Sequence, residues 1–208
     1  MAYAQITTRC NMRCRHCCYS CTREGEDMSI KVFRQIILQE DEALCLGGGE
    51  PTIHPRFWDF LALAIAHTDT PWLATNGKRT DVAIALAKMA QKAIIGCALS
   101  YDDHHEEIDP RVVRAFEKDL VLASFQTADR GVIADLREIR DVGGQEFNSG
   151  RCDFGDEGCP CDDIFIKPSG IVHQCGCEDS PVIGSVQEGY EPINGEHGVC
   201  HHDLEVEV

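Results

Sequence analysis

Short apolar segments alternate with amphipathic segments over roughly the first 145 residues, and this alternation constrains the fold more than any other feature of the sequence. Such strands and helices are joined by crossover connections that place the strands side by side in a parallel sheet. The sequence therefore predicts an α/β fold whose parallel sheet is open or curled toward a barrel. Ser29 and Thr80 are predicted N-caps, and Pro55 suits a first helical turn. The strands are predicted at residues 3–7, 43–46, 72–75, 93–100, 121–125 and 138–142, and the helices at 30–40, 55–65, 81–92, 109–118 and near 132–136.

The composition changes at about residue 147, where glycine and cysteine become frequent and helical periodicity ends. Two apolar runs on either side of Pro168-Ser169-Gly170 predict a β-hairpin over residues 163–175. The chain is therefore divided into a core domain, 1–146, and a small cysteine-rich C-terminal extension, 147–208.

Thirteen cysteines and a net charge of −16 narrow the functional classes. The N-terminus lacks the pattern of a secretory signal, and no apolar run approaches the roughly 20 residues that span a bilayer, which predicts a cytoplasmic protein without a membrane partner. In that reducing compartment, dense cysteine favours metal or redox chemistry over disulfides. Cys45 and Cys97 lie within apolar runs and are expected to be buried core thiols. The acidic charge argues against binding extended nucleic acid, although a single nucleotide in a pocket stays compatible with it.

Four polar clusters each follow a predicted strand. They read CNMRCRHC, GGGEPT, TNG and SYDDHH. The carboxyl ends of parallel strands meet at one rim of a sheet or barrel, and active sites of such folds assemble there. This placement predicts that the chain is an enzyme.

The first cluster holds three cysteines, Cys10, Cys14 and Cys17, in a CxxxCxxC pattern. A structural metal site normally closes with four protein ligands, whereas a 4Fe–4S cluster held by three thiolates leaves one iron open to a small molecule. Three cysteines therefore favour a cluster that performs chemistry. The alternative is a zinc site completed by His16 or Cys18.

These clusters, in this order, resemble the motifs of the radical S-adenosylmethionine (radical SAM) superfamily over roughly residues 4–120. The resemblance implies a partial (β/α)6 barrel of TIM type, with a 4Fe–4S cluster on Cys10, Cys14 and Cys17 that binds S-adenosylmethionine (SAM) at its open iron. It places Glu50 near the ammonium group of SAM. In this family an aromatic residue usually precedes the third cysteine, and here that position is His16. The implied SAM-binding residues are His16, Gly47, Gly48, Gly49, Glu50, Pro51, Thr75, Asn76, Ser100 and Asp102.

The cysteines of the extension resemble the auxiliary-cluster segments, of twitch or SPASM type, of one radical SAM branch. The resemblance implies an auxiliary 4Fe–4S cluster on Cys159, Cys161 and Cys175, completed by Cys177 or Cys152, with Cys200 a further contender. A zinc site across the hairpin, with His173, His201 or His202 as a possible fourth ligand, is the alternative. Cys18 and Cys21 have no assigned role, and His104 and His105 are expected to face solvent, with substrate contact as the alternative.

The implied activity is reductive cleavage of SAM, followed by hydrogen-atom abstraction from a peptide, protein or small-molecule substrate. A one-electron donor such as flavodoxin or ferredoxin would be a partner. Modification of a nucleotide or nucleic-acid base is the second functional hypothesis. A non-catalytic zinc or iron–sulfur protein is the third, although the shared rim of four polar clusters argues against it.

Overall fold

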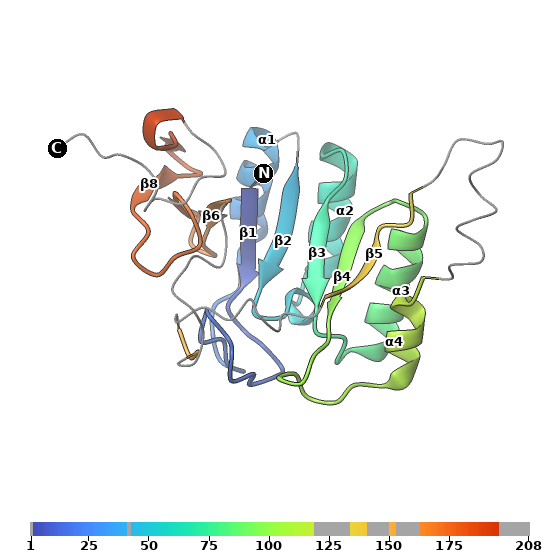
Figure 1. Ribbon diagram of the computed structural model, residues 1–208. Helices are drawn as coiled ribbons and strands as arrows, with labels where there is room; N and C mark the ends of the chain where they lie inside the picture. The colour runs from blue at the N-terminus through green and yellow to red at the C-terminus, as the bar shows by residue number, and fades with distance from the viewer. Residues whose placement is uncertain (1, 41–42, 119–133, 141–149, 153–162, 196–208) are drawn as a thin grey trace.

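The computed structural model describes residues 2–40, 43–118, 134–140, 150–152 and 163–195. Its strands are β1 (Ala2–Thr7), β2 (Leu44–Gly48), β3 (Trp72–Thr75), β4 (Gly96–Ser100), β5 (Arg137–Arg140), β6 (Ile164–Ile166), β7 (Ile171–His173), β8 (Val182–Ser185) and β9 (Gly189–Tyr190). They form one sheet in the order β5-β4-β3-β2-β1-β6-β7-β8-β9 (Figure 1). Every pair from β5 to β6 is parallel, and the pairs from β6 to β9 are antiparallel.

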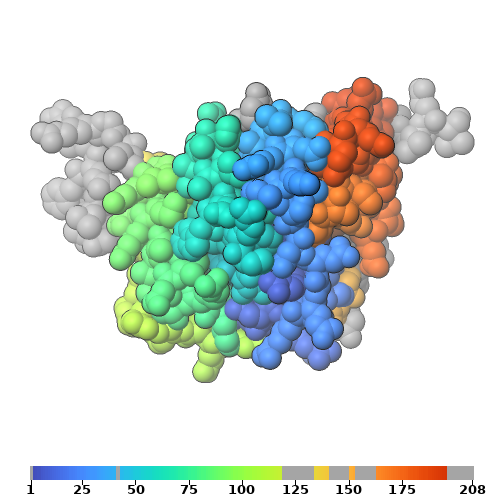
Figure 2. Space-filling model, turned by 180° about the vertical axis from the view of Figure 1, so that it is seen from behind, coloured from blue at the N-terminus to red at the C-terminus, as the bar shows by residue number. Residues whose placement is uncertain are grey.

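Within the described residues, four α-helices cover one face of this sheet, as Figures 1 and 2 show from opposite sides. They are α1 (Ile30–Gln39), α2 (Phe57–His67), α3 (Thr80–Gln91) and α4 (Pro110–Phe116), with short 3-10 helices η1 (Pro51–Ile53) and η2 (Ile193–Gly195). The apolar faces of the helices pack on the sheet, where the rings of Phe33 and Phe60 stack with centroids 4.3 Å apart. The architecture is the predicted α/β fold, a partial barrel of TIM type whose sheet is mostly parallel.

The structure confirms some of the predicted helix starts and differs from others. Ser29 is confirmed as the N-cap of α1, since its hydroxyl accepts a hydrogen bond from the Val32 N–H at 3.2 Å. The prediction for Thr80 was wrong, because Thr80 is the first residue of α3 and the cap position is Arg79, which makes no side-chain cap. Pro55 likewise lies in the turn before α2 rather than in its first helical turn.

The region after α4 differs from the expected order. The strand predicted at 138–142 is present as β5, and it pairs directly with β4. The strand predicted at 121–125 lies outside the described residues. The short helix expected near 132–136 is absent from its described part, because residues 134–136 are not helical.

The predicted hairpin of the extension is confirmed as β6 and β7. The place of this hairpin in the fold was not predicted. Strand β6 pairs with the side of β1 opposite β2 and continues the parallel sheet. In this register Tyr3 lies beside Phe165, and their rings stack with centroids 5.1 Å apart. The pairing holds the start of the extension against the strand that leads into the cysteine loop.

His54, just after η1, makes the stability of the fold depend on pH. Its Nε2–H donates to the Met28 carbonyl at 3.1 Å, and its Nδ1 accepts from the Arg56 N–H at 3.0 Å, so the ring must be neutral. Burial lowers the pKa of His54. The unfolded chain therefore takes up this proton first as the pH falls below about 6.5, which favours unfolding.

We expect the free energy of unfolding to fall by up to about 1 kcal/mol between about pH 7 and pH 5.5 because of this group. Denaturant titrations at both pH values measure the change in the free energy of unfolding. In a His54→Gln variant, the part of this change that comes from His54 should disappear. Replacing the exposed His67 with Gln is the control and should leave the pH dependence intact. An identical pH dependence in parent and His54→Gln protein would contradict the prediction.

Candidate active site

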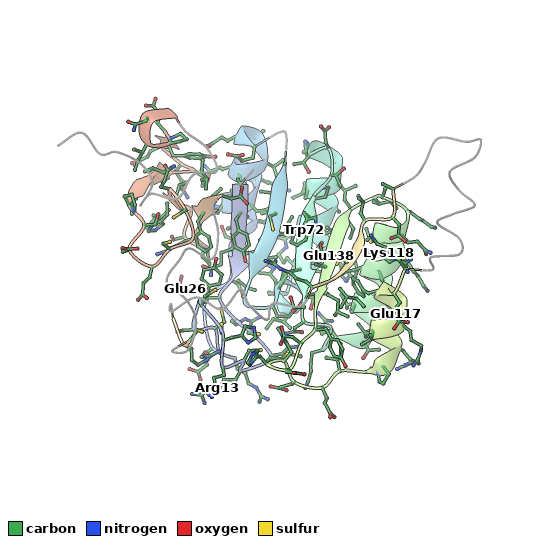
Figure 3. The ribbon with its side chains drawn as sticks, in the orientation of Figure 1. Arg13, Glu26, Trp72, Glu117, Lys118 and Glu138 are labelled. Atoms are coloured by element: carbon green, nitrogen blue, oxygen red, sulfur yellow. The ribbon has the colours of Figure 1, made fainter. Side chains whose placement is uncertain are left out.

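A cavity of about 700 Å³ opens where β1 to β5 end, on the side of the sheet where Trp72 lies (Figure 3). Residues from the loop after β1, from the ends of β2, β3, β4 and β5, and from the extension line it. The predicted residues on its wall are Cys10, Cys14, His16, Cys17, Gly47, Gly48, Gly49, Glu50, Pro51, Thr75, Asn76 and Ser100. The structure therefore brings the four polar clusters of the sequence to one place.

The three thiols of the CxxxCxxC loop all line this wall and belong to one small cluster of side chains. The Met12 N–H donates to Cys10 Sγ at 3.4 Å, and the Asn76 side-chain amide lies 3.7 Å from the same sulfur. Burial, and to a smaller extent the negative charges of Cys10 and Cys17, raise the pKa of Cys14 to about 12. Thiolates that repel one another are stabilised by a bound cationic metal centre, so this donor set fits an iron–sulfur cluster.

Hydrogen bonds to the Glu50 carboxylate connect the end of β2 with the end of β3. The Glu50 side chain is 1% exposed, and one carboxylate oxygen accepts from the Thr52 N–H at 3.2 Å, the Thr52 hydroxyl at 2.5 Å and the Thr75 hydroxyl at 2.8 Å. The other oxygen accepts from the Asn76 N–H at 2.7 Å. Burial raises the pKa of Glu50, and the four donated hydrogen bonds oppose that rise. The carboxylate is thus fixed in the cavity wall beside the thiols.

The glycine run before Glu50 lets two strands approach closely. A Cβ on Gly48, which has a φ of 137°, would lie 2.0 Å from the Thr7 carbonyl oxygen, and one on Gly47 would overlap the Tyr3 ring. The Gly48 N–H instead donates to the Tyr3 hydroxyl at 2.7 Å. Side chains at these two positions would push β2 away from β1 and displace the wall of the cavity.

Arg151, in the extension, clamps the cysteine loop. Its guanidinium donates to the carbonyls of Cys14 at 3.1 Å and Cys21 at 2.9 Å, and its backbone N–H donates to the Cys17 carbonyl at 3.0 Å. Gly150 permits this approach, because a Cβ there would lie 2.2 Å from the Cys18 carbonyl oxygen. Three contacts from one residue hold the loop in the shape that gathers its thiols.

An Arg151→Gln variant is expected to bind the loop cluster more weakly, since it loses both guanidinium contacts. Groups that orient metal ligands typically change metal affinity by about 10-fold or more, and we expect iron loss to a chelator to accelerate on that order. Absorbance decay of reconstituted protein with excess chelator measures the rate. Arg34→Gln, on the exposed side of α1, is the matched control. Equal decay rates in the two variants would rule out the clamp.

Asp102, predicted to line the SAM pocket, lies just behind the cavity wall. Its Oδ1 accepts from His105 Nδ1–H at 2.8 Å and from the His104 N–H at 2.8 Å. Burial raises the pKa of Asp102, but these hydrogen bonds outweigh burial, and the pKa falls below its ordinary value. His105 itself lines the cavity, so its expected exposure to solvent was wrong, whereas His104 is exposed as expected.

The second cysteine group is described only in part. Cys159, Cys161 and Cys200 lie outside the described residues, as do His201 and His202. Cys152 and Cys175 are buried, and Cys177 lines a second cavity of about 250 Å³. Cys18 lines both cavities, and the Nδ1–H of His173, on the wall of the second one, donates to the Ser180 carbonyl at 2.8 Å.

Several wall residues were not predicted. Tyr3, Trp72, Arg140, Arg151 and Asp163 line the cavity. Alternation along β1 and β3 could have placed the two aromatic rings on the open face of the sheet. No local sequence pattern marks Arg140, Arg151 or Asp163 as a site residue. Arg151 and Asp163 reach the cavity through the fold of the extension. Cys45, expected to be a core thiol, is buried but also faces the cavity.

The model of the radical SAM superfamily matches residues 4–143, and the chain belongs to this family. It is an enzyme family whose cofactors are a 4Fe–4S cluster and SAM. Mycofactocin maturase MftC of Mycobacterium ulcerans is 30% identical over 149 residues, which cover 65% of this chain and 40% of that protein. A tungsten-containing aldehyde ferredoxin oxidoreductase cofactor-modifying protein of Pyrococcus furiosus is 35% identical over 82 residues, 36% of this chain and 23% of that protein. The chain thus spans well under half the length of the curated relatives it matches.

The fold is similar to that of BtrN, solved in complex with AdoMet and 2-DOIA. The TM-score is 0.55 at 15% identity, over 91% of this chain and 79% of BtrN. This likeness concerns the fold alone. Among the described residues, none of the helices has the length and apolar character needed to cross a membrane.

Proposed function

We propose that this radical SAM enzyme binds its catalytic 4Fe–4S cluster through Cys10, Cys14 and Cys17 and modifies a peptide substrate. The observation that carries the proposal is the shared cavity, whose wall holds the three thiols together with Glu50 and the glycine-rich end of β2. A structural zinc site would need no such cavity or carboxylate beside it. A 4Fe–4S cluster held by these three thiols would supply the electron for reductive cleavage of SAM, the chemistry that allows hydrogen-atom abstraction from a substrate.

The residues of the chain bind, orient and shield in this reaction. Glu50 offers a fixed negative charge to the ammonium group of SAM, and Asn76 lies between that carboxylate and the sulfur of Cys10. Thr75, Ser100 and His16 contact the nucleoside. The cavity walls would limit the contact of water with the reacting atoms, as such chemistry requires.

A peptide is the substrate class we favour. The relative with 30% identity is named a maturase, which supports modification of a precursor, and the acidic chain makes nucleic acid a weaker candidate. A cavity of about 700 Å³ must hold the nucleoside as well, so it has room for one or two side chains of a substrate rather than a folded domain. Nucleotide modification is the second candidate.

We further propose that residues 147–208 form an auxiliary-cluster extension to the core of 1–146. Cys159, Cys161 and Cys175 are the proposed ligands, with Cys177 or Cys152 as the fourth. The burial of Cys152 and Cys175, and the place of Cys177 on a second cavity, are compatible with such a centre. The electron donor, flavodoxin or ferredoxin, is proposed on the chemistry alone.

The direct test is an anaerobic assay. Protein reconstituted with iron and sulfide should turn brown and, with dithionite, convert SAM into methionine and 5′-deoxyadenosine. Incubation with deuterated peptides from the source should then transfer deuterium into 5′-deoxyadenosine. Colourless protein that binds only zinc and leaves SAM intact would refute the proposal.

A further inference from the structure

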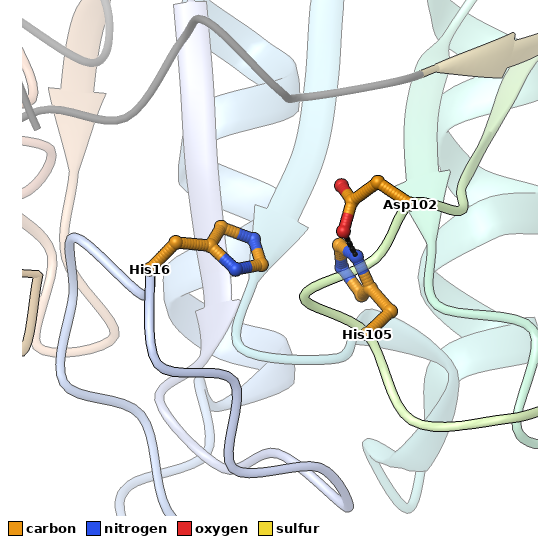
Figure 4. A group of neighbouring side chains, drawn as sticks. All are labelled: His16, Asp102 and His105. Carbon is orange, nitrogen blue, oxygen red and sulfur yellow. Dashed lines mark hydrogen bonds and ion pairs between the residues drawn. The ribbon is translucent and has the colours of Figure 1, made fainter.

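One cluster of nitrogen and oxygen donors at the cavity remains without an assigned metal. Ligand atoms of His16, Asp102 and His105 all lie within 4.8 Å of one another. Figure 4 shows that His16 comes from the loop after β1, while Asp102 and His105 come from the loop after β4 on the opposite side. Two segments far apart in the sequence thus converge on one point.

The spacing of these donors suits a single ion. Asp102 Oδ1 and His105 Nδ1 are 2.8 Å apart, and two ligand atoms that bind one ion at right angles, each at about 2.1 Å, lie about 3 Å apart. When the ion binds, His105 would coordinate through Nδ1 and carry its one proton on Nε2 instead. His16 then needs only a small movement to supply the third ligand.

The surroundings hold the donors in place. The side chains of His105 and Asp102 are only 8% and 4% exposed, and the His104 N–H fixes the same carboxylate oxygen. The His16 and His105 rings meet edge to face with centroids 4.8 Å apart. Both histidines line the cavity, which gives an ion a route of entry and leaves its remaining coordination positions open to that space.

We propose that His16, Asp102 and His105 form a further, mononuclear site for a divalent first-row transition-metal ion such as Mn²⁺, Fe²⁺ or Zn²⁺. Two imidazoles with one carboxylate favour these ions over Ca²⁺ and Mg²⁺, which prefer oxygen ligands alone. Because His16 also belongs to the proposed nucleoside pocket, the ion and SAM exclude one another, an inference that rests on the proposed function. Free transition metal would then lower the affinity of the enzyme for SAM.

Mn²⁺ is the probe, because it binds thiolates weakly and its electron paramagnetic resonance (EPR) signal is strong. The full chain is reconstituted with iron–sulfur clusters, kept oxidised so that they are EPR-silent, and titrated with Mn²⁺. We expect one Mn²⁺ per chain with nitrogen couplings from imidazole in pulsed spectra. His105→Gln and His16→Gln, which alter the two separate loops, should each weaken binding by about 10-fold or more. His104→Gln is the matched control and should bind as the parent does.

SAM added to the Mn²⁺ complex should release the ion. The same titration on a Cys14→Ala variant should still find the Mn²⁺ site, so the site is tested separately from the radical chemistry. Equal Mn²⁺ affinity in the parent, His105→Gln and His16→Gln proteins, or spectra without nitrogen couplings, would overturn the proposal and leave Asp102 and His105 as a hydrogen-bonded pair only. Retention of Mn²⁺ at saturating SAM would contradict the inference that the ion and SAM share one pocket.

Discussion

Protein with Cys14 replaced by Ala is expected to form 5′-deoxyadenosine no faster than a protein-free mixture of SAM and dithionite. Three thiolates hold a 4Fe–4S cluster with one open iron, and without Cys14 the CxxxCxxC loop keeps only two of them. Cys21, in the small apolar cluster around Cys10 and Met12, also lines the cavity, but its side chain is almost wholly buried and it belongs to no part of the CxxxCxxC pattern. Product analysis by chromatography under strictly anaerobic conditions gives the rate.

The matched control for this loss is Cys97→Ala. Cys97 is a fully buried cysteine of β4 that is not on the cavity wall, so its removal should cost some stability but leave SAM cleavage near the parent rate. If Cys14→Ala protein still cleaves SAM at the parent rate, the three loop cysteines do not hold the catalytic cluster.

Replacing Glu50 with Ala is expected to damage both the fold and SAM binding. The carboxylate accepts four hydrogen bonds in a buried position, and its loss leaves buried donors of Thr52, Thr75 and Asn76 without an acceptor. Each such donor costs about 1–3 kcal/mol, so we expect the free energy of unfolding to fall by roughly 3–5 kcal/mol. Denaturant titration measures this loss, and calorimetry with SAM should find no binding.

A graded pair of variants separates charge from hydrogen bonding. Glu50→Gln keeps the shape and one carbonyl oxygen, so it should recover much of the stability but little of the SAM affinity, because the negative charge is gone. Glu138→Ala, an exposed carboxylate on β5, should change neither property. Full SAM affinity in Glu50→Gln protein would show that the charge of Glu50 does not bind the ammonium group.

Local patterns predicted the core elements well because each has a local cause. Ser29 caps α1 with its own hydroxyl, and Asp109 accepts from the Arg111 N–H at the start of α4. The convergence of Cys10, Glu50 and Asn76 followed from one rule, that parallel strands end at the same rim. Thr80 failed as a cap because a threonine before an apolar run fits the first helical turn almost as well as the cap position.

Long-range placement could not be predicted from the same patterns. No residue of β6 indicates that its partner is β1, because a short apolar run fits beside almost any parallel strand. The Arg151 clamp depends on that placement, since it reaches the loop only when the extension lies next to the core. His105 was missed for a similar reason, because its burial comes from Asp102 and from His16 on another loop.

The pairing of β1 with β6 has a consequence for how the polypeptide is made. Ala2 pairs with Ile164, so during synthesis β1 waits until β6 has been made before its second side is covered. Until then, one side of it presents unpaired amide groups to any other strand nearby, which is a route to aggregation. A chaperone that shields this side of β1 should therefore raise the yield of correctly assembled enzyme.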